Sequence, residues 1–493
     1  MLIPKMEDAV KYCGEYNYVP VKEEIYSDIR TPIQVLKILK KQSSHVYMLE
    51  SVEDQQNWGR YTFLGFEPKM CITCKDGQLK VVDDAGVVLH EETTSHPATY
   101  LKEVLRQYRS PRLEDFPTFT GGLVGYFAYD YIKYSEPSLK LDASDEEHFK
   151  DLDLMLFDKV IAFDNLKQKI VIVANASTAD IETSYARALR EIAEIIRLIR
   201  KGEEGTFAPG RMHGSYRSLF EKEAFCSMVE RAKRYIYEGD IFQVVLSNRL
   251  EADFEGSLFN TYRVLRTINP SPYMFYFSGD DVEVAGASPE TLVKLENGIL
   301  HTFPLAGTRP RGKDREEDLK LEKELLADEK ERAEHNMLVD LGRNDIGRIS
   351  KFGSVEVEKY MSIERYSHVM HIGSTVRGEI REDKCELDAV DAILPAGTLS
   401  GAPKLRALEI INELENNKRG IYGGAIGYVD FTGNLDTCIA IRIAFKKNGK
   451  VFVRSGAGIV ADSVPENEYT ECLNKARAVM AAIEKSQEME DGE

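Results

Sequence analysis

Apolar residues recur along the chain at two spacings, one typical of strands and one typical of helices. The strands and helices that these spacings predict occur in groups and do not strictly alternate. Short apolar or alternating runs bounded by glycine and other turn residues predict strands at 45–51, 160–173, 241–250 and 422–459. Apolar residues at helical spacing predict helices at 31–41, 179–200, 219–238 and 463–485. Strands in hairpin-like succession with helices grouped between them predict an α+β fold, not a doubly wound parallel sheet.

The last predicted helix carries the densest set of polar positions. Ser463 followed by Glu466 has the form of a capping box. Further along, Glu468, Glu471 and Lys475 share one face, because they stand at i, i+3 and i+7. The sequence therefore predicts a helix that presents two carboxylates and one amine together.

A second predicted helix, roughly 316–341, repeats this arrangement with Glu331 and Glu334. Two helices that each offer a carboxylate pair are suited to hold one hard cation, and Mg²⁺ prefers such oxygen ligands. Two solvated acidic helix faces are the alternative, and spacing alone favours it.

The positions of glycine and proline suggest where one region of the chain ends and the next begins. Residues 1 to 30 resemble a helical lead-in, and the stretch 201–210 is rich in helix-breaking residues. We expect the boundary there, with an N-terminal region over 1–205 and a C-terminal region over 206–493.

Charge and composition narrow the class of partner. The 493 residues carry a net charge of −18, which argues against nucleic acid and anionic membranes as partners. The N-terminus lacks the apolar core of a signal peptide, and no apolar run is long enough to span a bilayer. Seven scattered cysteines are typical of a reducing compartment. We therefore expect a cytoplasmic protein, and an anionic small substrate is still compatible with a local cluster of cations.

Several short motifs in the C-terminal region could bind an anion, although each alone is more often structural. Arg442 lies in an apolar stretch predicted as strand, where a lone charge needs a partner. Glycines at 456–458 permit close approach of backbone N–H groups. The remaining motifs are 288–290 (SPE), 304–312 (PLAGTRPRG), 366–371 (YSHVMH) and 397–404 (GTLSGAPK).

Taken in order, these motifs resemble the chorismate-utilising enzymes, and among them the large subunits (component I) of anthranilate synthases. The resemblance extends over about 20–485 and is strongest from Gly239 to Lys475. It implies two large antiparallel sheets packed as a sandwich, with helices outside and both halves of the chain contributing strands. It also implies conversion of chorismate and ammonia to anthranilate and pyruvate, the first step of tryptophan biosynthesis.

The resemblance also assigns metal-binding and substrate-binding roles to individual residues. Glu334 and Glu471 match direct Mg²⁺ ligands, and Glu331 and Glu468 complete that site. The matching chorismate contacts are Gly307, Thr308, Tyr422, Arg442, Gly456, Ala457 and Gly458, with Lys475 close by. One substrate carboxylate would then bind the metal and the other Arg442 and backbone donors.

Four further residues, Glu290, His371, Thr398 and Gln243, match catalytic positions. Glu290 corresponds to a general acid that protonates the departing C4 hydroxyl, and a carboxyl shielded from water can keep its proton for that role. His371 matches a histidine of the elimination step, although without the family a satisfied core histidine is the better interpretation. Thr398 matches an active-site threonine that orients substrate.

Two positions separate related activities. In the water-using isochorismate and salicylate synthases, a lysine stands at the position of Gln243, where it can act as a base on water. In aminodeoxychorismate synthases a nucleophilic lysine often occupies the position of Ala306. Glutamine and alanine together favour anthranilate, with aminodeoxychorismate synthase as the alternative.

Two segments match the site for feedback tryptophan. They contribute Glu50 and Ser51 from 49–51, and Pro272, Tyr273 and Met274 from 269–274. A strand end and a proline turn are the structural alternative.

No glutaminase motif accompanies these segments, so a separate glutamine amidotransferase subunit is expected to supply ammonia. A tryptophan-sensing subunit without catalysis is the non-enzyme alternative, and the intact carboxylate set argues against it.

Overall fold

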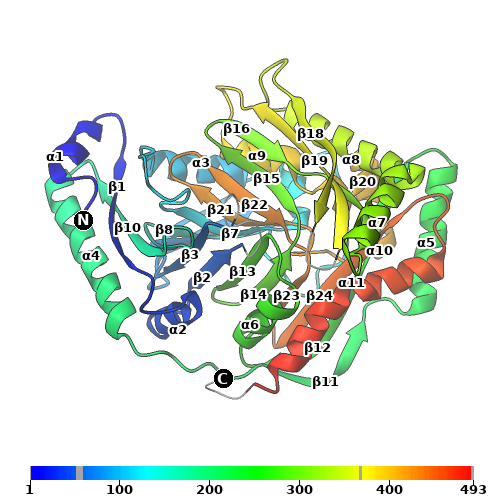
Figure 1. Cartoon of the computed structure of the whole chain (residues 1–493), viewed down its shortest axis with the longest axis horizontal. Coiled ribbons are helices and arrows are strands. Elements are labelled where there is room, and N and C mark those ends of the chain that lie inside the picture. Colours follow the sequence, from blue (N-terminus) through cyan, green and yellow to red (C-terminus); the bar gives the residue numbers. More distant parts are fainter. Residues whose placement is uncertain (1, 52–58, 366–368, 490–493) are drawn as a thin grey trace.

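Two large β-sheets form the centre of the molecule, and helices surround them (Figure 1). The computed structural model describes residues 2–51, 59–365 and 369–489. Within these residues each sheet has twelve strands, and neighbouring strands are antiparallel. The α+β class and the two antiparallel sheets predicted from the sequence are confirmed.

The first sheet mixes strands from both halves of the chain. Its order is β1 (Tyr18–Tyr26), β10 (Lys169–Ser177), β9 (Lys159–Asp164), β3 (Tyr61–Phe66), β2 (Val46–Glu50), β13 (Tyr273–Ser278), β14 (Glu283–Ser288), β23 (Ile443–Lys447), β24 (Lys450–Ile459), β12 (Gln243–Glu255) and β11 (Arg211–Ser218), with β20 (Gly401–Ala402) beside β12. The two halves meet where β2 pairs with β13, and Glu50 lies opposite Met274.

The second sheet is built in the same way. Its order is β17 (Leu305–Pro310), β19 (Val369–Glu379), β16 (Ile299–Thr302), β15 (Thr291–Glu296), β22 (Leu435–Ile439), β21 (Ala425–Asp430), β7 (Gly122–Phe127), β8 (Leu152–Phe157), β4 (Met70–Lys75), β5 (Gln78–Val82) and β6 (Val88–Thr93), with β18 (Glu356–Arg365) beside β19. Here β7 pairs with β21. Strands from both sides of the predicted 205/206 boundary thus enter both sheets, and that boundary lies between a helix ending at Lys201 and β11.

Helices cover the outer faces of the sheets. They are α1 (Met6–Ala9), α2 (Pro32–Gln42), α3 (Pro97–Gln107), α4 (Ile181–Lys201), α5 (Lys222–Tyr237), α6 (Phe259–Ile268), α7 (Arg315–Ala327), α8 (Glu329–Gly347), α9 (Glu386–Ile393), α10 (Lys404–Glu415) and α11 (Pro465–Ser486). The predicted start of α2 is confirmed: Thr31 forms a capping box with Gln34, and Pro32 occupies the first turn. No helix in the described ranges is both long and apolar enough to cross a membrane.

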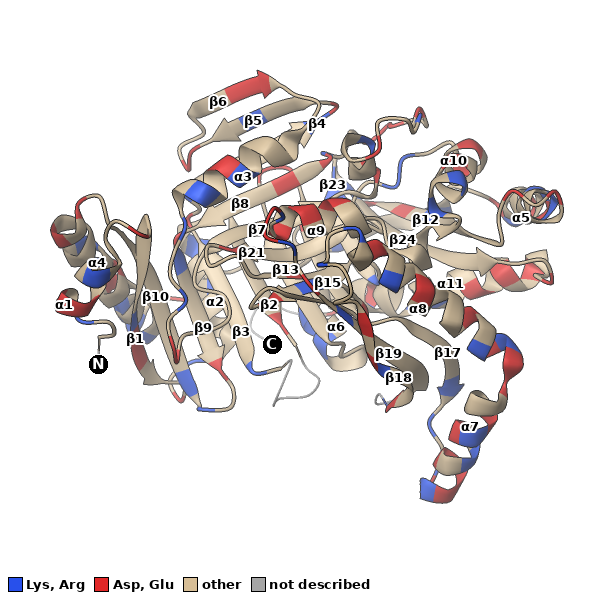
Figure 2. Cartoon of the chain, turned by 90° about the horizontal axis from the view of Figure 1, so that it is seen from above, with Lys and Arg blue, Asp and Glu red and all other residues tan. Residues whose placement is uncertain are grey.

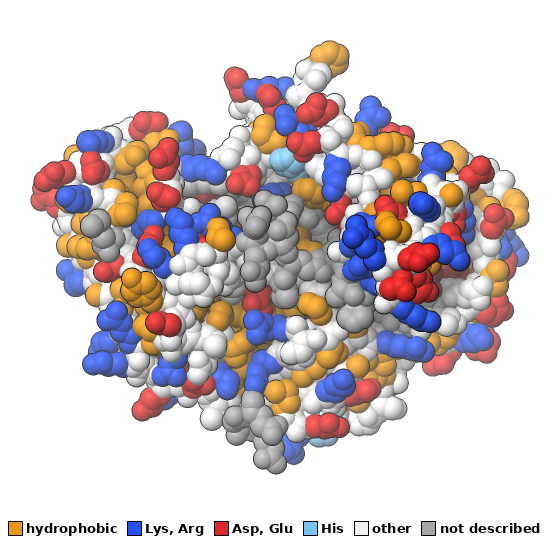
Figure 3. Space-filling view, viewed as in Figure 1, with side chains coloured by type: hydrophobic (Ala, Val, Ile, Leu, Met, Phe, Trp, Pro, Cys, Tyr) orange, Lys and Arg blue, Asp and Glu red, His pale blue; other side chains and the backbone are white. Residues whose placement is uncertain are grey.

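The largest core cluster lies between the sheets, and the second fills the outer face of the first sheet. Tyr47 and Phe275 belong to the cluster between the sheets, whereas their neighbours Met48 and Met274 pack on the helix side. This alternation follows from the period of two along a strand. Seen from above, α7 projects from the body of the molecule (Figure 2). Acidic and basic side chains are interspersed over the face in Figure 3.

Three predictions about helices are corrected by the structure. The lead-in over residues 1–30 contains only the short helix α1 and then the strand β1. The helix predicted over 316–341 is two helices, because Asp328 caps a new one by accepting hydrogen bonds from the N–H groups of Lys330 and Glu331.

The capping box at Ser463 is absent, since α11 begins at Pro465 after Val464 and the Ser463 hydroxyl accepts a hydrogen bond from the Val460 N–H. His371 lies near the start of β19, and residues 366–368 of its motif fall outside the described residues.

Candidate active site

A cavity of about 930 Å³ lies between α8, α11 and strands of both sheets. Its walls bring together nearly all residues predicted for catalysis, metal binding and substrate binding, although they span more than 230 positions of sequence. They are Gln243, Glu290, Gly307, Thr308, Glu331, Glu334, His371, Thr398, Tyr422, Arg442, Gly456, Gly458, Glu468, Glu471 and Lys475.

The wall made by β12 and β24 explains which predicted residue does not line the cavity. Gly456 and Gly458 face the cavity, so Ala457 between them points to the opposite side, where it packs against α5 and α10. A Cβ atom at Gly458 would lie 2.6 Å from the Gln243 amide nitrogen. Glycine at this position therefore leaves room for the glutamine side chain beside the cavity.

Glu290 lies in the connection between β14 and β15, within reach of Thr398. Thr398, in the short turn Gly397–Leu399, donates a hydrogen bond from its hydroxyl to Glu290 Oε1 at 2.9 Å. Burial raises the pKa of Glu290 to about 7, while the Thr398 hydrogen bond and the charge of Lys475 act in the opposite direction. The carboxyl group is therefore partly protonated near neutral pH and can donate a proton.

His371 is held by the neighbouring strand β17. Its Nδ1 lies 2.9 Å from the Gly307 carbonyl oxygen and 3.1 Å from the Thr308 hydroxyl. Burial lowers the pKa of His371, with the charge of Arg442 adding to this effect and the hydrogen bond to Gly307 opposing it. Since a carbonyl only accepts, Nδ1 carries the proton of the neutral ring and Nε2 the lone pair.

Arg442 and Lys475 place two cations in the cavity. The prediction that Arg442 lies within a strand is wrong. Arg442 lies between β22 and β23 and has a φ of +54°. Its Nη1 donates to the Lys475 carbonyl at 2.7 Å. Lys475 in turn donates to the Gly456 carbonyl at 3.1 Å and pairs with Glu471 at 2.6 Å. A left-handed residue between two strands thus turns the guanidinium toward α11.

The four carboxylates come from the two predicted acidic helices, α8 and α11. The pKa of Glu334 is raised, first by burial and then by the charge of Glu331. Glu331 also accepts from Arg309 at 3.3 Å, while Glu471 is held by Lys475. Excess negative charge here fits a divalent cation, which commonly takes one or two carboxylates and completes its shell with substrate and water. In the described part of the chain, no three such groups are close enough to form a closed cage.

A second cavity of about 540 Å³ contains the residues predicted for tryptophan, namely Glu50, Ser51, Pro272, Tyr273 and Met274. The Glu50 carboxylate accepts hydrogen bonds from Tyr262 and Arg266 of α6, with Arg266 Nη2 at 3.0 Å. The Tyr273 hydroxyl donates to Asp436 at 2.8 Å. Pro272 lines both cavities, so the two adjoin at this residue.

Comparison with known proteins places the chain in a family. The model of the chorismate binding enzymes matches residues 44–481. The chain belongs to this family. It is 48% identical to anthranilate synthase component 1 of Acetivibrio thermocellus over 99% of this chain and 100% of the relative. With anthranilate synthase component 1 of Aquifex aeolicus the identity is 46%, over 99% of each chain.

Solved structures show the same fold in this chorismate binding family. Anthranilate synthase component I from Streptococcus pneumoniae TIGR4 superposes with a TM-score of 0.75 at 38% identity, covering 93% of this chain and 99% of that chain. The menaquinone-specific isochorismate synthase of Escherichia coli gives a TM-score of 0.68 at 18% identity, over 97% and 98% of the two chains. At that identity the likeness shows the fold alone.

Sequence reasoning missed a group of buried charges that adjoins the cavity. Arg454 lines the cavity and is 2% exposed, and it is joined by Glu415 and Arg419, which the cavity does not expose. Glu415 and Arg419 stand four apart near a helix end, a spacing that is also typical of a solvated pair. Arg454 within VFVRSGAG was the available signal, because an arginine in an apolar strand needs a buried partner.

Proposed function

We propose that this chain is the component 1 of an anthranilate synthase, converting chorismate and ammonia into anthranilate, pyruvate and water in tryptophan biosynthesis. The observation that carries the proposal is that a single cavity brings together a protonatable Glu290, the cations Arg442 and Lys475, and carboxylates of the two acidic helices. Relatives named anthranilate synthase component 1, at up to 48% identity over nearly the whole chain, support this choice of reaction.

The first step is displacement at the substrate ring. Glu290 in its protonated form gives its proton to the departing C4 hydroxyl, while ammonia adds at C2, so the oxygen leaves as water. Thr398 holds the carboxyl group in place through its 2.9 Å hydrogen bond. Gln243 cannot act as a base on water as lysine can, which favours ammonia over water as the nucleophile.

The second step eliminates pyruvate and makes the ring aromatic. His371, neutral and with its proton on Nδ1, offers Nε2 as a base for the ring proton that must leave. Substrate would be held by Arg442 and the backbone donors at 456–458 through one carboxylate. Glu334 and Glu471, supported by Glu331 and Glu468, would hold Mg²⁺ near the other. Bound there, the ion would draw off negative charge that develops on the ring carboxylate.

Ammonia and regulation complete the proposal. A separate glutamine amidotransferase subunit would supply ammonia, and free ammonium would replace it in the purified chain. Tryptophan would bind the second cavity as feedback inhibitor, with Ser51 and the backbone of 272–274 as polar partners. We place this activity in the cytoplasm, where the seven thiols would stay reduced.

Product identity tests the reaction directly. The purified chain would be incubated with chorismate, Mg²⁺ and ammonium, with each component omitted in turn. We expect anthranilate, formed only when all three are present and suppressed by tryptophan. A product that keeps its amino group at C4 would instead identify an aminodeoxychorismate synthase. Binding of chorismate or tryptophan without turnover would refute the catalytic proposal.

A further inference from the structure

A buried ion cluster adjoins the catalytic cavity at the wall that β12 and β24 contribute, and one of its members, Arg454, lines the cavity. It consists of Glu415 at the end of α10, Arg419 and Arg454, and each is at most 3% exposed. Arg419 Nη2 and Nε lie 2.6 and 3.0 Å from the two Glu415 oxygens, and Arg454 Nη2 lies 2.7 Å from one of them. We call these three residues the Glu415 cluster. Its net charge is one positive unit.

Arg419 contacts three separate segments of the cavity wall. Its Nη1 donates to the Leu399 carbonyl at 2.7 Å, and its Nη2 donates to the Val245 carbonyl, also at 2.7 Å. The guanidinium lies 6.0 Å from the centre of the Tyr422 ring. Leu399 follows Thr398 directly, and Leu399, Val245 and Tyr422 all line the cavity. One side chain therefore ties together wall segments that are far apart in the sequence.

Glu415 fixes the same wall through its contacts with β12. Its Oε1 accepts from the Ser247 N–H at 2.7 Å and from the Ser247 hydroxyl at 3.0 Å. The Arg454 Nε donates to that hydroxyl at 2.8 Å, which joins β24 to β12. Buried ion clusters are often no more stable than apolar residues of the same volume. Stability alone therefore gives little reason for three buried charges at this place.

We propose that Arg419 is a positioning residue for the proposed reaction, holding Thr398 against Glu290 through the Leu399 carbonyl. This inference rests on the proposed function. A guanidinium makes these contacts in several directions at once because its donors form a rigid planar fork, which lysine lacks. The net positive charge of the Glu415 cluster also favours a dianionic substrate in the adjoining cavity.

The test is Arg419→Lys, which keeps the charge and loses the fork. We expect kcat to fall about 10- to 100-fold, as small displacements of catalytic groups cause. The pH above which kcat falls should move upward: a looser Thr398 hydrogen bond lets the Glu290 pKa rise, so Glu290 stays protonated to higher pH. In a Thr398→Val background, Arg419→Lys should no longer move this pH.

Lys22→Met is the matched control. Lys22 is a cation exposed by only 1%, paired with Glu24 at 3.0 Å in the edge strand β1. We expect this variant to lower Tm without moving the pH profile. An Arg419→Lys enzyme whose pH profile coincides with that of wild type overturns the positioning role.

If Arg419→Lys does not fold, Ser247→Ala removes only the hydroxyl that Glu415 and Arg454 share, and it should shift the profile in the same direction. A Ser247→Ala enzyme whose pH profile of kcat equals that of wild type would also overturn the positioning role. A wild-type chain that forms no anthranilate refutes the proposed function, whereas an active wild type with unaffected variants refutes the positioning role alone.

Discussion

Glu290 depends on its surroundings for the protonation state that its proposed role requires. A carboxyl group in water is ionised at neutral pH, but removal from water raises the pKa of Glu290 to about 7. The proton is lost as the pH rises through that value. Activity that needs this proton should therefore be retained below pH 7 and decline above it.

Replacement of Glu290 by glutamine tests the proton donor. Glu290→Gln keeps the size and the hydrogen bond with Thr398 but has no proton to give, so kcat should fall by about 10²- to 10⁴-fold. The residual rate should also lose the alkaline decline. Rates would be compared at a constant concentration of unprotonated ammonia, so that the nucleophile does not change with pH. A variant that keeps the alkaline decline would assign it to another group.

Ser51 offers a separate test of the second cavity. Ser51→Phe would fill part of the 540 Å³ space and remove a hydroxyl, so tryptophan inhibition should weaken about tenfold or more, which corresponds to about 1.4 kcal/mol. Turnover without tryptophan should stay near that of wild type, because Ser51 does not line the catalytic cavity. The inhibition curve measures this, and an unchanged curve would remove tryptophan from the cavity.

Residue types were predictable from sequence, but their partners were not. The sequence singled out Glu290, His371 and Arg442, and the fold brings all three to one cavity. It could not show that the Glu50 carboxylate is held by Tyr262 and Arg266, because β2 and α6 are far apart in the sequence and come together only once β2 pairs with β13. The positive φ of Arg442 was equally hidden, since an apolar stretch does not reveal where one strand ends and the next begins.

At the scale of elements, the acidic helices show both the strength and the limit of periodicity. Spacing of three placed Glu331 with Glu334 and Glu468 with Glu471, and these pairs do line the cavity. The predicted helix starts are wrong for two reasons. Asp328 caps α8 by accepting hydrogen bonds from Lys330 and Glu331, whereas the Ser463 hydroxyl accepts from the Val460 N–H and does not cap α11. The sequence therefore predicted which residues share a helix face, but not the residue at which each helix begins.

Helix α11 carries the prediction for the metal. Glu471→Ala removes a half-exposed carboxylate that pairs with Lys475 at the edge of the cavity, so the fold should be nearly as stable as wild type. Activity should fall by more than about 100-fold, since loss of groups that merely support metal ligands already costs about 10- to 100-fold. Tm and a titration of rate against Mg²⁺ would be measured together. Wild-type turnover with unchanged Mg²⁺ dependence would contradict the ligand assignment.

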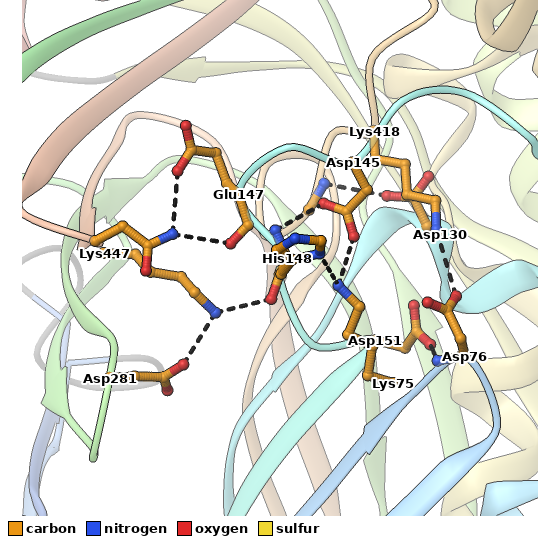
Figure 4. Close-up of polar contacts among 12 residues, drawn as sticks. Lys75, Asp76, Asp130, Asp145, Glu147, His148, Asp151, Asp281, Lys418 and Lys447 are labelled. Atoms are coloured by element: carbon orange, nitrogen blue, oxygen red, sulfur yellow. Dashed lines mark hydrogen bonds and ion pairs between the residues drawn. The ribbon is translucent and has the colours of Figure 1, made fainter.

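At the scale of the whole molecule, the two halves of the chain are interleaved. β2 pairs with β13 in one sheet, and β7 pairs with β21 in the other. Polar contacts add to this (Figure 4): Lys75 of β4 pairs with Asp145, and Lys447 of β23 donates to the His148 carbonyl at 2.8 Å and pairs with Asp281. The N-terminal segment that carries Asp145 and His148 thus contacts both sheets.

This interleaving predicts the behaviour of fragments. Residues 206–493 alone should be insoluble or unfolded, because β13 and β21 would lose partners and expose unpaired edges. Co-expression with residues 1–205 should restore soluble protein, and solubility with circular dichroism would measure both cases. Cooperative unfolding of the isolated 206–493 fragment would show that the C-terminal region folds independently.

The position of Pro272, in the lining of both cavities, has a consequence for how an inhibitor would be measured. Pro272 lines both spaces, so a ligand that displaces it on one side alters the other side directly. Linkage then requires reciprocity: if tryptophan weakens chorismate binding by some factor, chorismate weakens tryptophan binding by the same factor. The apparent potency of tryptophan would therefore fall as substrate accumulates, and restraint on the pathway would relax when its precursor is abundant.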